Sequence, residues 1–375
     1  MHSLRPVSGP TAEVVEALAS WLAADGEPEP LVVETSGSTG RPKRVVLSRR
    51  ALVASAEATA KRLGVQRRWL LALPVSYVAG LQVAVRSLLA GHRPVLGEDH
   101  ETFDEAVDAL GDGGLCSLVP TQLAHLMDDE EDLAALARFH TVLLGGGPVD
   151  TALRARAEAN GVHVVATYGA SETAGGCVYD GRPLDGVRVR LDEAPGGRGR
   201  ILLGGPTLAD GYLGDVELTA ETFVDGWYRT SDAGRWLDGA DEGRLQVIGR
   251  LDDVVVSGGV NVPGPAVAQR LRAHPGVREA EVVGVDDPEW GRRVVAVVVP
   301  ATRPPLRPPT LDQLRDFVGA TLPRAWAPRD VRYVEALPLL GNGKVDRLRL
   351  ATLAETGHGG ETGETDETDE TDEGE

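Results

Sequence analysis

The sequence is poor in cysteine and contains no long apolar run. Only two cysteines occur among its 375 residues, Cys116 and Cys177, which excludes a disulfide framework or a cysteine metal cluster. We expect both to be small core residues. No apolar run reaches the roughly 18 residues that a membrane span requires. The N-terminus lacks a signal-peptide core, so we expect a cytoplasmic protein.

Basic residues are also scarce relative to acidic ones, 38 against 57, and the formal net charge is −19. Ten of the acidic residues lie in the stretch 355–375, which repeats Glu-Thr-Asp and contains neither Lys nor Arg. Such a segment cannot bury apolar surface, so we predict a disordered acidic tail. The acidic balance argues against a nucleic-acid partner.

Apolar runs alternate with helical patterns through the first half of the chain. The runs cover 69–73, 115–119 and 141–144, and the helical patterns cover 48–63, 81–90 and 149–160. This alternation predicts an α/β fold with a largely parallel sheet. After Gly181 short glycine-rich segments predict a β subdomain, followed by a smaller, mobile α+β domain. The predicted boundaries are 1–250 for the large domain, 251–354 for the small domain and 355–375 for the tail.

A polar stretch near the front, residues 35–43 (T-S-G-S-T-G-R-P-K), joins two apolar runs that resemble short strands. Its glycines permit backbone angles that a side chain would forbid, so several groups can converge on an anion such as a polyphosphate. Those groups are the backbone at Gly37 and Gly40, the hydroxyls of Thr35, Ser36, Ser38 and Thr39, and the ammonium of Lys43. The Walker spacing is absent, and a surface turn is the alternative.

Two further motifs follow predicted strands. Gly145-Gly146-Gly147 would let a flat ligand such as a purine lie against bare backbone, although a plain tight turn explains it equally well. The second motif is Tyr168-Gly169-Ala170-Ser171-Glu172-Thr173. Its tyrosine offers a stacking face, its hydroxyls offer hydrogen bonds, and Glu172 offers a carboxylate of the kind that Mg²⁺ prefers. A solvated surface acid is the alternative for Glu172.

The second half of the chain contributes an acid and a lysine. Asp232 can accept hydrogen bonds from both hydroxyls of a sugar diol, or form a surface salt bridge with Arg250. Lys344 follows glycines in Gly341-Asn342-Gly343, so a mobile loop can deliver its ammonium into a closed site. A lysine in such a loop is otherwise simply solvated.

Taken in order from Thr35 to about Arg347, these motifs resemble the adenylate-forming ligases, which include acyl- and aryl-CoA synthetases, luciferases and peptide-synthetase adenylation domains. The resemblance implies ATP and Mg²⁺ as cofactors and coenzyme A as co-substrate. It implies phosphate contacts from residues 35–43, an adenine pocket at Gly145–Gly147, a metal ligand in Glu172, and ribose contacts from Asp232 and Arg250. It also implies catalytic roles for Lys43 and Lys344, a hinge at Asp252, and CoA contacts at Gly258 and Gly259. The segment 199–212 matches the same family and is interpreted as structural.

The segment 73–82 (L-P-V-S-Y-V-A-G-L-Q) and the early position of the phosphate loop resemble the short actinobacterial type of o-succinylbenzoate–CoA ligases of menaquinone synthesis. Their acid carries two carboxylates, and Arg86 can bind the one that is not activated, unless it is a surface arginine. Tyr77 stands where many relatives have histidine, and it is the second expected substrate residue.

Three alternatives remain at this point. The protein can be another aryl- or acyl-CoA ligase, or a stand-alone adenylation domain that loads a carrier-protein thiol. It can also be a nucleotide-binding protein without turnover. The expected partners are small molecules, namely a carboxylic acid, ATP and CoA, with a homodimer as one option for the assembly.

Overall fold

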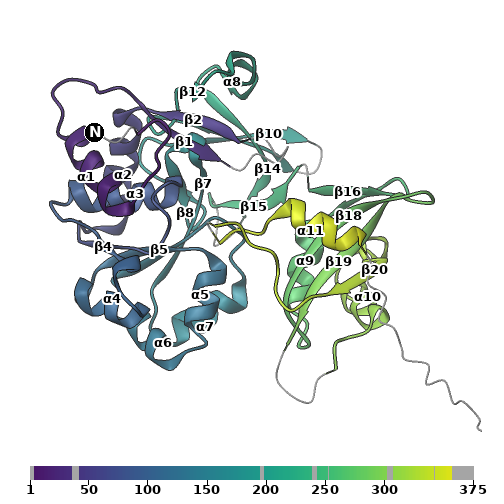
Figure 1. Cartoon of the computed structure of the whole chain (residues 1–375). Helices are drawn as coiled ribbons and strands as arrows, with labels where there is room; N and C mark the ends of the chain where they lie inside the picture. The colour runs from purple at the N-terminus through teal and green to yellow at the C-terminus, as the bar shows by residue number, and fades with distance from the viewer. Residues whose placement is uncertain are drawn as a thin grey trace, which may run out of the picture.

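The protein folds into a large and a small part (Figure 1). The structure is a computed structural model that describes residues 4–35, 42–194, 198–238, 243–251, 253–301, 307–341 and 343–356. Elements α1 to β15 form the large part, and elements β16 to α11 form the small part. This arrangement agrees with the predicted α/β fold, in which a larger N-terminal domain precedes a smaller C-terminal one. The predicted acidic tail from residue 357 onward lies outside the described residues.

A seven-stranded sheet in the order β4-β3-β5-β6-β7-β8-β9 forms the centre of the large part. Its strands are β3 (Trp69–Leu71), β4 (Val95–Leu96), β5 (Leu115–Leu118), β6 (Thr141–Leu144), β7 (Val164–Ala170), β8 (Gly175–Tyr179) and β9 (Arg182–Pro183). The pairs from β4 to β7 are parallel, as predicted, whereas β7–β8 and β8–β9 are antiparallel.

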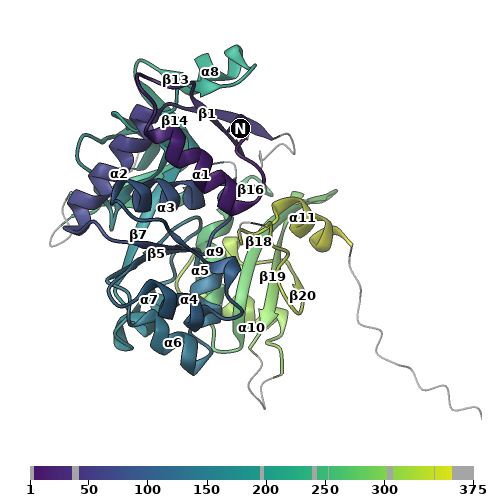
Figure 2. The ribbon, with the colours of Figure 1, turned by 60° about the vertical axis from the view of Figure 1, so that its left-hand side comes forward.

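Helices cover both faces of this sheet, with α1 to α3 on one side and α4 to α7 on the other (Figure 2). They are α1 (Thr11–Leu22), α2 (Arg49–Leu63), α3 (Val78–Leu89), α4 (Phe103–Leu110), α5 (Pro120–Leu126), α6 (Glu130–Leu136) and α7 (Thr151–Ala159). Because both faces are covered, every residue of β5 and β6 is buried, which explains why their sequences are mostly apolar. Cys116 and Cys177 are free and buried, as expected.

Two smaller sheets complete the large part. A three-stranded sheet has the order β1-β2-β12, and a five-stranded sheet joins β10, β11, β14 and β13, with β15 pairing to β14. Their strands are β1 (Leu31–Thr35), β2 (Lys43–Leu47), β10 (Arg188–Ala194), β11 (Arg198–Gly204), β12 (Gly211–Tyr212), β13 (Phe223–Val224), β14 (Trp227–Trp236) and β15 (Leu245–Arg250), and helix α8 (Val216–Thr222) follows β12. The predicted β subdomain is thereby present.

The small part packs helices against a three-stranded sheet in the order β18-β19-β20. Its elements are the hairpin β16 (Val254–Ser257) and β17 (Val260–Pro263), strands β18 (Val277–Asp287), β19 (Gly291–Pro300) and β20 (Asp330–Tyr333), and helices α9 (Gly264–Arg272), α10 (Leu311–Gly319) and α11 (Arg347–Glu355). Valines and leucines of β18, β19, α9 and α10 form a separate buried core. The small part therefore has a hydrophobic core of its own.

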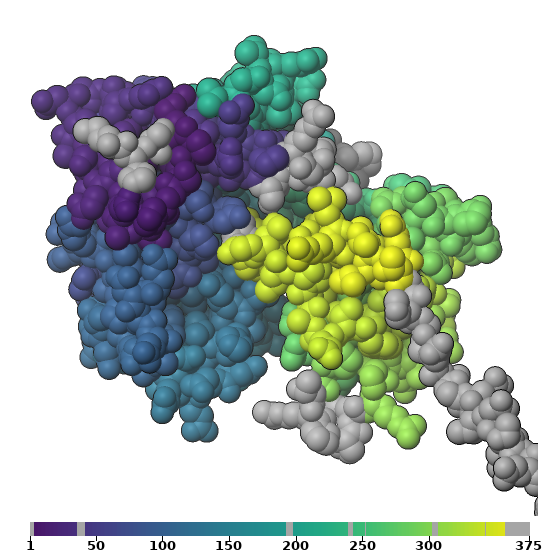
Figure 3. Space-filling model, in the orientation of Figure 1, coloured from purple at the N-terminus to yellow at the C-terminus, as the bar shows by residue number. Residues whose placement is uncertain are grey.

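The segment before α11 reaches back to the large part. In the space-filling view its atoms, drawn in yellow, lie against the surface of the large part (Figure 3). One contact is a hydrogen bond from the Thr121 hydroxyl to the Gly343 carbonyl oxygen, 3.1 Å long. No helix within the described ranges combines the length and apolarity needed to cross a membrane.

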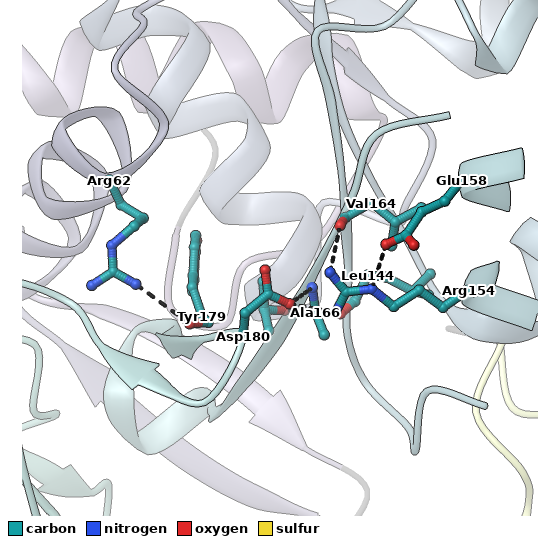
Figure 4. A network of polar contacts seen from close by, with 9 residues as sticks. Arg62, Leu144, Arg154, Glu158, Val164, Ala166, Tyr179 and Asp180 are labelled. Atoms are coloured by element: carbon teal, nitrogen blue, oxygen red, sulfur yellow. Dashed lines mark hydrogen bonds and ion pairs between the residues drawn. The ribbon is translucent and has the colours of Figure 1, made fainter. Parts of the chain in front are cut away.

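A polar network fixes the edge of the central sheet (Figure 4). Asp180, which follows β8, accepts hydrogen bonds from Arg154 Nη1 at 2.6 Å and from the Ala166 backbone N–H at 3.1 Å. Arg154 also donates to Glu158 and to the Val164 carbonyl oxygen. The network therefore joins α7, β7 and the β8–β9 turn, and it steadies the strand that carries Tyr168.

We predict that Asp180→Ala lowers the free energy of unfolding by about 2–3 kcal/mol, measured by urea denaturation. The change removes the acceptor for a backbone N–H and an arginine. It also places alanine at a φ of +46°, which is a further cost. Asp180→Asn keeps an acceptor and tolerates that backbone angle, so it should cost less than half as much. A loss no larger than that of the exposed control Asp108→Ala would contradict this account of the network.

Candidate functional site

The ends of the predicted phosphate loop are held together by a β-hairpin. Thr35 at the end of β1 pairs with Lys43 at the start of β2, and the Thr35 hydroxyl lies 3.5 Å from the Lys43 carbonyl oxygen. The predicted strands on either side of the loop are therefore present. Ser36, Gly37, Ser38, Thr39 and Gly40 lie outside the described residues, so their predicted phosphate contacts stay a prediction.

Glu172 is linked to Lys43 through a tyrosine. Glu172 is only 8% exposed, and its Oε1 accepts a 2.8 Å hydrogen bond from the Tyr212 hydroxyl. The Lys43 ammonium lies 5.4 Å from the centre of the Tyr212 ring. Burial, and then the carboxylate of Glu172, raise the pKa of Tyr212, so the tyrosine stays a proton donor. The carboxylate is thereby fixed in direction rather than solvated.

A second tyrosine, Tyr168, orients the second predicted acid, Asp232, through a hydrogen bond. The Tyr168 hydroxyl on β7 donates to Asp232 Oδ2 on β14 at 2.7 Å. Burial, and then the charge of Asp232, raise the pKa of Tyr168 above its ordinary value. Asp232 pairs with Arg250 across strands β14 and β15, which places the two predicted ribose residues side by side. Ser171 and Glu172 follow β7 in one short 3-10 turn, and Gly169 lies within the strand.

Lys344 reaches this group of residues from the small part. A Cβ atom on Gly146, which has a φ of +82°, would lie 3.0 Å from Lys344 Cε, so the glycine leaves room for the lysine. Gly145, Gly146 and Gly147 directly follow β6, as predicted. The structure therefore brings the glycine turn at Gly145–Gly147 into contact with Lys344.

The surroundings of Lys344 alter its acidity, although the side chain keeps access to solvent. Desolvation by the protein around it lowers the pKa of the Lys344 ammonium, while the carboxylates of Glu172 and Asp232 raise it and Arg250 lowers it further. Lys344 is therefore within electrostatic reach of both Glu172 and Asp232.

The predicted CoA and hinge residues lie at the start of the small part. Gly258 and Gly259 form the exposed turn between β16 and β17. The predicted hinge residue Asp252 lies outside the described residues, two positions before the first residue of β16 in the sequence. Its role stays a prediction.

The two predicted acid-binding residues lie at opposite ends of helix α3. Tyr77 precedes its first turn, and Arg86 lies in its last turn. Arg86 is only 8% exposed, so the alternative of a surface arginine is wrong. Its guanidinium lies 5.4 Å from the centre of the Trp69 ring, and Nη2 lies 3.4 Å from the Tyr179 hydroxyl.

The carboxylate that this site offers to a magnesium ion is that of Glu172. Within the described ranges, no group of three or more His, Cys, Asp or Glu side chains could hold a metal ion. Mg²⁺ bound through one or two carboxylates and substrate phosphates needs no such group. The buried, oriented carboxylate of Glu172 fits that donor set.

The order and spacing of these residues agree with the sequence of a known family. Residues 31–213 match the AMP-binding enzyme family, and residues 266–344 match the AMP-binding enzyme C-terminal domain. A probable 2-succinylbenzoate–CoA ligase of Mycobacterium tuberculosis is 46% identical over 327 residues, which cover 85% of this chain and 83% of that relative. The chain belongs to the AMP-binding enzyme family.

Solved structures of the AMP-binding family agree with this assignment. The o-succinylbenzoate CoA synthetase of Bacillus subtilis, in complex with the acyl-adenylate intermediate OSB-AMP, superimposes with a TM-score of 0.72 at 27% identity, over 85% of this chain and 68% of that one. The same enzyme in complex with ATP and magnesium ion gives a TM-score of 0.71 at 26% identity, over 86% of this chain and 69% of that one.

Sequence reasoning missed two contributors to the site. Tyr212 was interpreted as part of a structural segment, yet it contacts both Glu172 and Lys43. Thr121 donates a hydrogen bond to the loop that carries Lys344, but it belongs to none of the motifs described in the sequence analysis. Thr173 was expected to offer a hydroxyl to a ligand; it instead bonds the backbone of Ala170 and Gly175. The sequence signal that could have identified Tyr212 is its position as an aromatic residue in a glycine-rich stretch.

We predict that kcat/KM of the adenylate-forming step falls at alkaline pH with a midpoint below 10.5, the ordinary pKa of lysine. Because burial lowers the pKa of Lys344, its ammonium is lost at a lower pH than that of a free lysine. A pH–rate profile measures the midpoint. In Lys344→Arg this alkaline decline should disappear, since arginine keeps its charge. A decline that persists unchanged in that variant would assign it to another group.

Proposed function

We propose that this protein is an ATP-dependent ligase that adenylates 2-succinylbenzoate and transfers the acyl group to coenzyme A. The observation that carries the proposal is the contact of Lys344 with the turn at Gly146, within electrostatic reach of Glu172 and Asp232, in a chain 46% identical to a probable 2-succinylbenzoate–CoA ligase. The Bacillus subtilis enzyme bound to OSB-AMP supports the choice of acid, and its complex with ATP and magnesium ion supports the cofactors.

The proposed first step joins two anions, because the carboxylate of the acid attacks the α-phosphate of ATP. The bond between the α- and β-phosphates breaks, so that the products are the acyl-adenylate and pyrophosphate. Positive charge aimed at the phosphate lowers that barrier. Lys43 and Lys344 are the cations that this chain supplies, and Asp232 would orient the ribose. Bound Mg²⁺ would add charge on the phosphate oxygens, with Glu172 as its ligand.

In the proposed second step the thiolate of CoA attacks the acyl carbon of the adenylate, and AMP leaves as the thioester forms. A turn of the small domain about Asp252 would withdraw Lys344 and bring the turn of Gly258 and Gly259 to the adenylate. The separate core of the small part supports domain boundaries near residues 250 and 251. A cytoplasmic location and a homodimer stay predictions from the sequence.

The test is CoA-dependent AMP release across a panel of aromatic and aliphatic acids. We expect 2-succinylbenzoate to give the highest kcat/KM. Lys344→Ala should slow adenylation by about 100-fold or more yet spare thioester formation from supplied acyl-adenylate. Lys61→Ala is the control, because this lysine is exposed and pairs with Asp185.

Each of four results would contradict part of the proposal. Preference for another acid would redirect it to another aryl- or acyl-CoA ligase, and turnover with a carrier protein but not with CoA would favour a stand-alone adenylation domain. Absence of pyrophosphate release with every acid tested would leave a nucleotide-binding protein without turnover. Equal loss of both steps in Lys344→Ala would contradict the assignment of Lys344 to the first step alone.

Arg86 is proposed to bind the second carboxylate of the acid. Its Nε is buried and has no hydrogen-bond partner in the part of the chain that the structure describes. The Tyr179 hydroxyl lies 3.4 Å from Arg86 Nη2, and a Cβ on Gly176 would lie 3.3 Å from Tyr179 Cε1. A buried guanidinium without a carboxylate is costly, and a substrate carboxylate would relieve that cost.

We predict that Arg86→Ala raises the KM for 2-succinylbenzoate about tenfold or more, because a charged hydrogen bond is lost. The KM for a benzoate that lacks the second carboxylate should change little. Steady-state kinetics with both acids measure the difference, and the exposed Arg93→Ala serves as control. An unchanged KM for the dicarboxylate would remove Arg86 from the acid-binding site.

A further inference from the structure

The turn that carries Lys344 is closed by its own backbone. The Leu340 N–H donates to the Lys344 carbonyl oxygen at 2.7 Å, and the Gly343 N–H donates to the Leu340 carbonyl oxygen at 2.9 Å. Leu339 and Val345 form an antiparallel bridge at the base of the turn. Gly343 has a φ of +74°, which a glycine adopts without strain. Because these bonds tie Lys344 to its neighbours, a contact that fixes Gly343 also fixes the backbone that aims the ammonium.

The start of helix α5 in the large part forms a seat for Gly343. The Thr121 hydroxyl donates to the Gly343 carbonyl oxygen at 3.1 Å, across the boundary between the two parts. A Cβ atom on Gly343 would stand 2.8 Å from Val119 Cγ2, so the glycine lies directly against this valine. Val119 Cγ1 lies 3.2 Å from the place of a Cβ atom on Gly146, beside the Lys344 side chain. The seat therefore combines one hydrogen-bond donor with one apolar contact.

The seat is held in place by the large part itself. The Val119 N–H donates to Gln122 Oε1 at 3.1 Å, and Gln122 Nε2 donates to the Ala72 carbonyl oxygen at 3.1 Å. The Val119 side chain is buried. Within the described residues, the Thr121 hydroxyl makes no hydrogen bond to its own helix. The hydroxyl thus contributes to the contact between the two parts rather than to the stability of α5.

We propose that Thr121 is a positioning residue for the adenylate-forming step: its hydroxyl holds Gly343, and thereby Lys344, in the site while the acid attacks ATP. The proposal rests on the proposed ligase function, in which Lys344 acts in the first step and is withdrawn before the second. A hydrogen bond between the two parts is present in the first arrangement and is broken when the small domain turns. Thr121 would therefore act on one step of the reaction and not on the other.

The neutral character of this bond suits a contact that breaks in every turnover. A hydrogen bond between uncharged groups contributes less than one to a charged group. An ion pair across the boundary would hold the small part more tightly and slow its departure. The ion pairs of the nearby Arg347, with Asp253 at 3.0 Å and with Glu281 at 3.8 Å, instead lie within the small part and would move with it.

Thr121→Val tests the hydroxyl, because valine keeps the branched shape and lacks the donor. We expect kcat/KM of acid-dependent ATP–pyrophosphate exchange to fall about fivefold, the size of one neutral hydrogen bond made in the transition state. Thioester formation from supplied acyl-adenylate and CoA should be unchanged. Thr121→Ser, which restores a hydroxyl, should recover most of the exchange activity.

A threonine on α11 provides the matched control. The Thr352 hydroxyl also donates to a carbonyl oxygen, that of Leu348 at 3.1 Å, but on the exposed face of the helix. Thr352→Val should leave both steps unchanged. The urea midpoint of unfolding in Thr121→Val should equal that of wild type, because the hydroxyl makes no hydrogen bond to its own helix.

The proposal is overturned if Thr121→Val leaves pyrophosphate exchange unchanged, or if Thr121→Ser fails to restore it. It is equally overturned if both steps slow by the same factor together with a lower urea midpoint, since the threonine would then act through the stability of the large part. Absence of pyrophosphate exchange in wild type would instead refute the proposed ligase function, so the two failures are distinguishable.

Discussion

The contact of Lys344 with the glycine turn of the large part is the interaction on which the rest of the structure depends. It connects the small part of the molecule to the site built by the large part, where desolvation lowers the pKa of the ammonium and the carboxylates of Glu172 and Asp232 raise it. The hydrogen bond between Thr121 and Gly343 holds the approaching loop, and the missing side chain of Gly146 leaves space for the lysine. A chemistry that joins a carboxylate to a phosphate requires positive charge at this place, and the fold supplies it from a separate domain.

The acids that face Lys344 are oriented by tyrosines. Tyr212 donates to Glu172, and Tyr168 donates to Asp232, and burial keeps both phenols protonated. Each carboxylate is thus directed before a ligand binds, so less reorganisation is needed when charge develops. The polar network around Asp180 extends this support, because it fixes the strand from which Tyr168 projects.

The sequence predicted the elements of the fold that follow from the local pattern of apolar, polar and glycine residues. The hairpin around the phosphate loop followed from two apolar runs on either side of a glycine-rich stretch. The helical pattern 48–63 corresponds to helix α2, whose first turn is capped by the Ser48 hydroxyl, which accepts from the Ala51 N–H. The central sheet followed from mostly apolar runs that alternate with helical patterns. Lys344 and Glu172 were found by their motifs, and the structure brings them together.

Contacts between distant segments could not be predicted in this way. Tyr212 meets Glu172 because β12 pairs with β2, a pairing that no local periodicity encodes. Arg86 was placed on the correct helix, but its burial against Trp69 and Tyr179 depends on how α3 packs on β3 and β8. The hydrogen bond from Thr121 to Gly343 joins residues 222 positions apart, and nothing in the sequence around Thr121 distinguishes it.

The most direct test of the account is a crystal structure with a non-hydrolysable ATP analogue and Mg²⁺. The account predicts a triphosphate held between the loop that joins Thr35 to Lys43 and the ammonium of Lys344, with the metal on Glu172 and the ribose on Asp232. A triphosphate bound away from both lysines would contradict it.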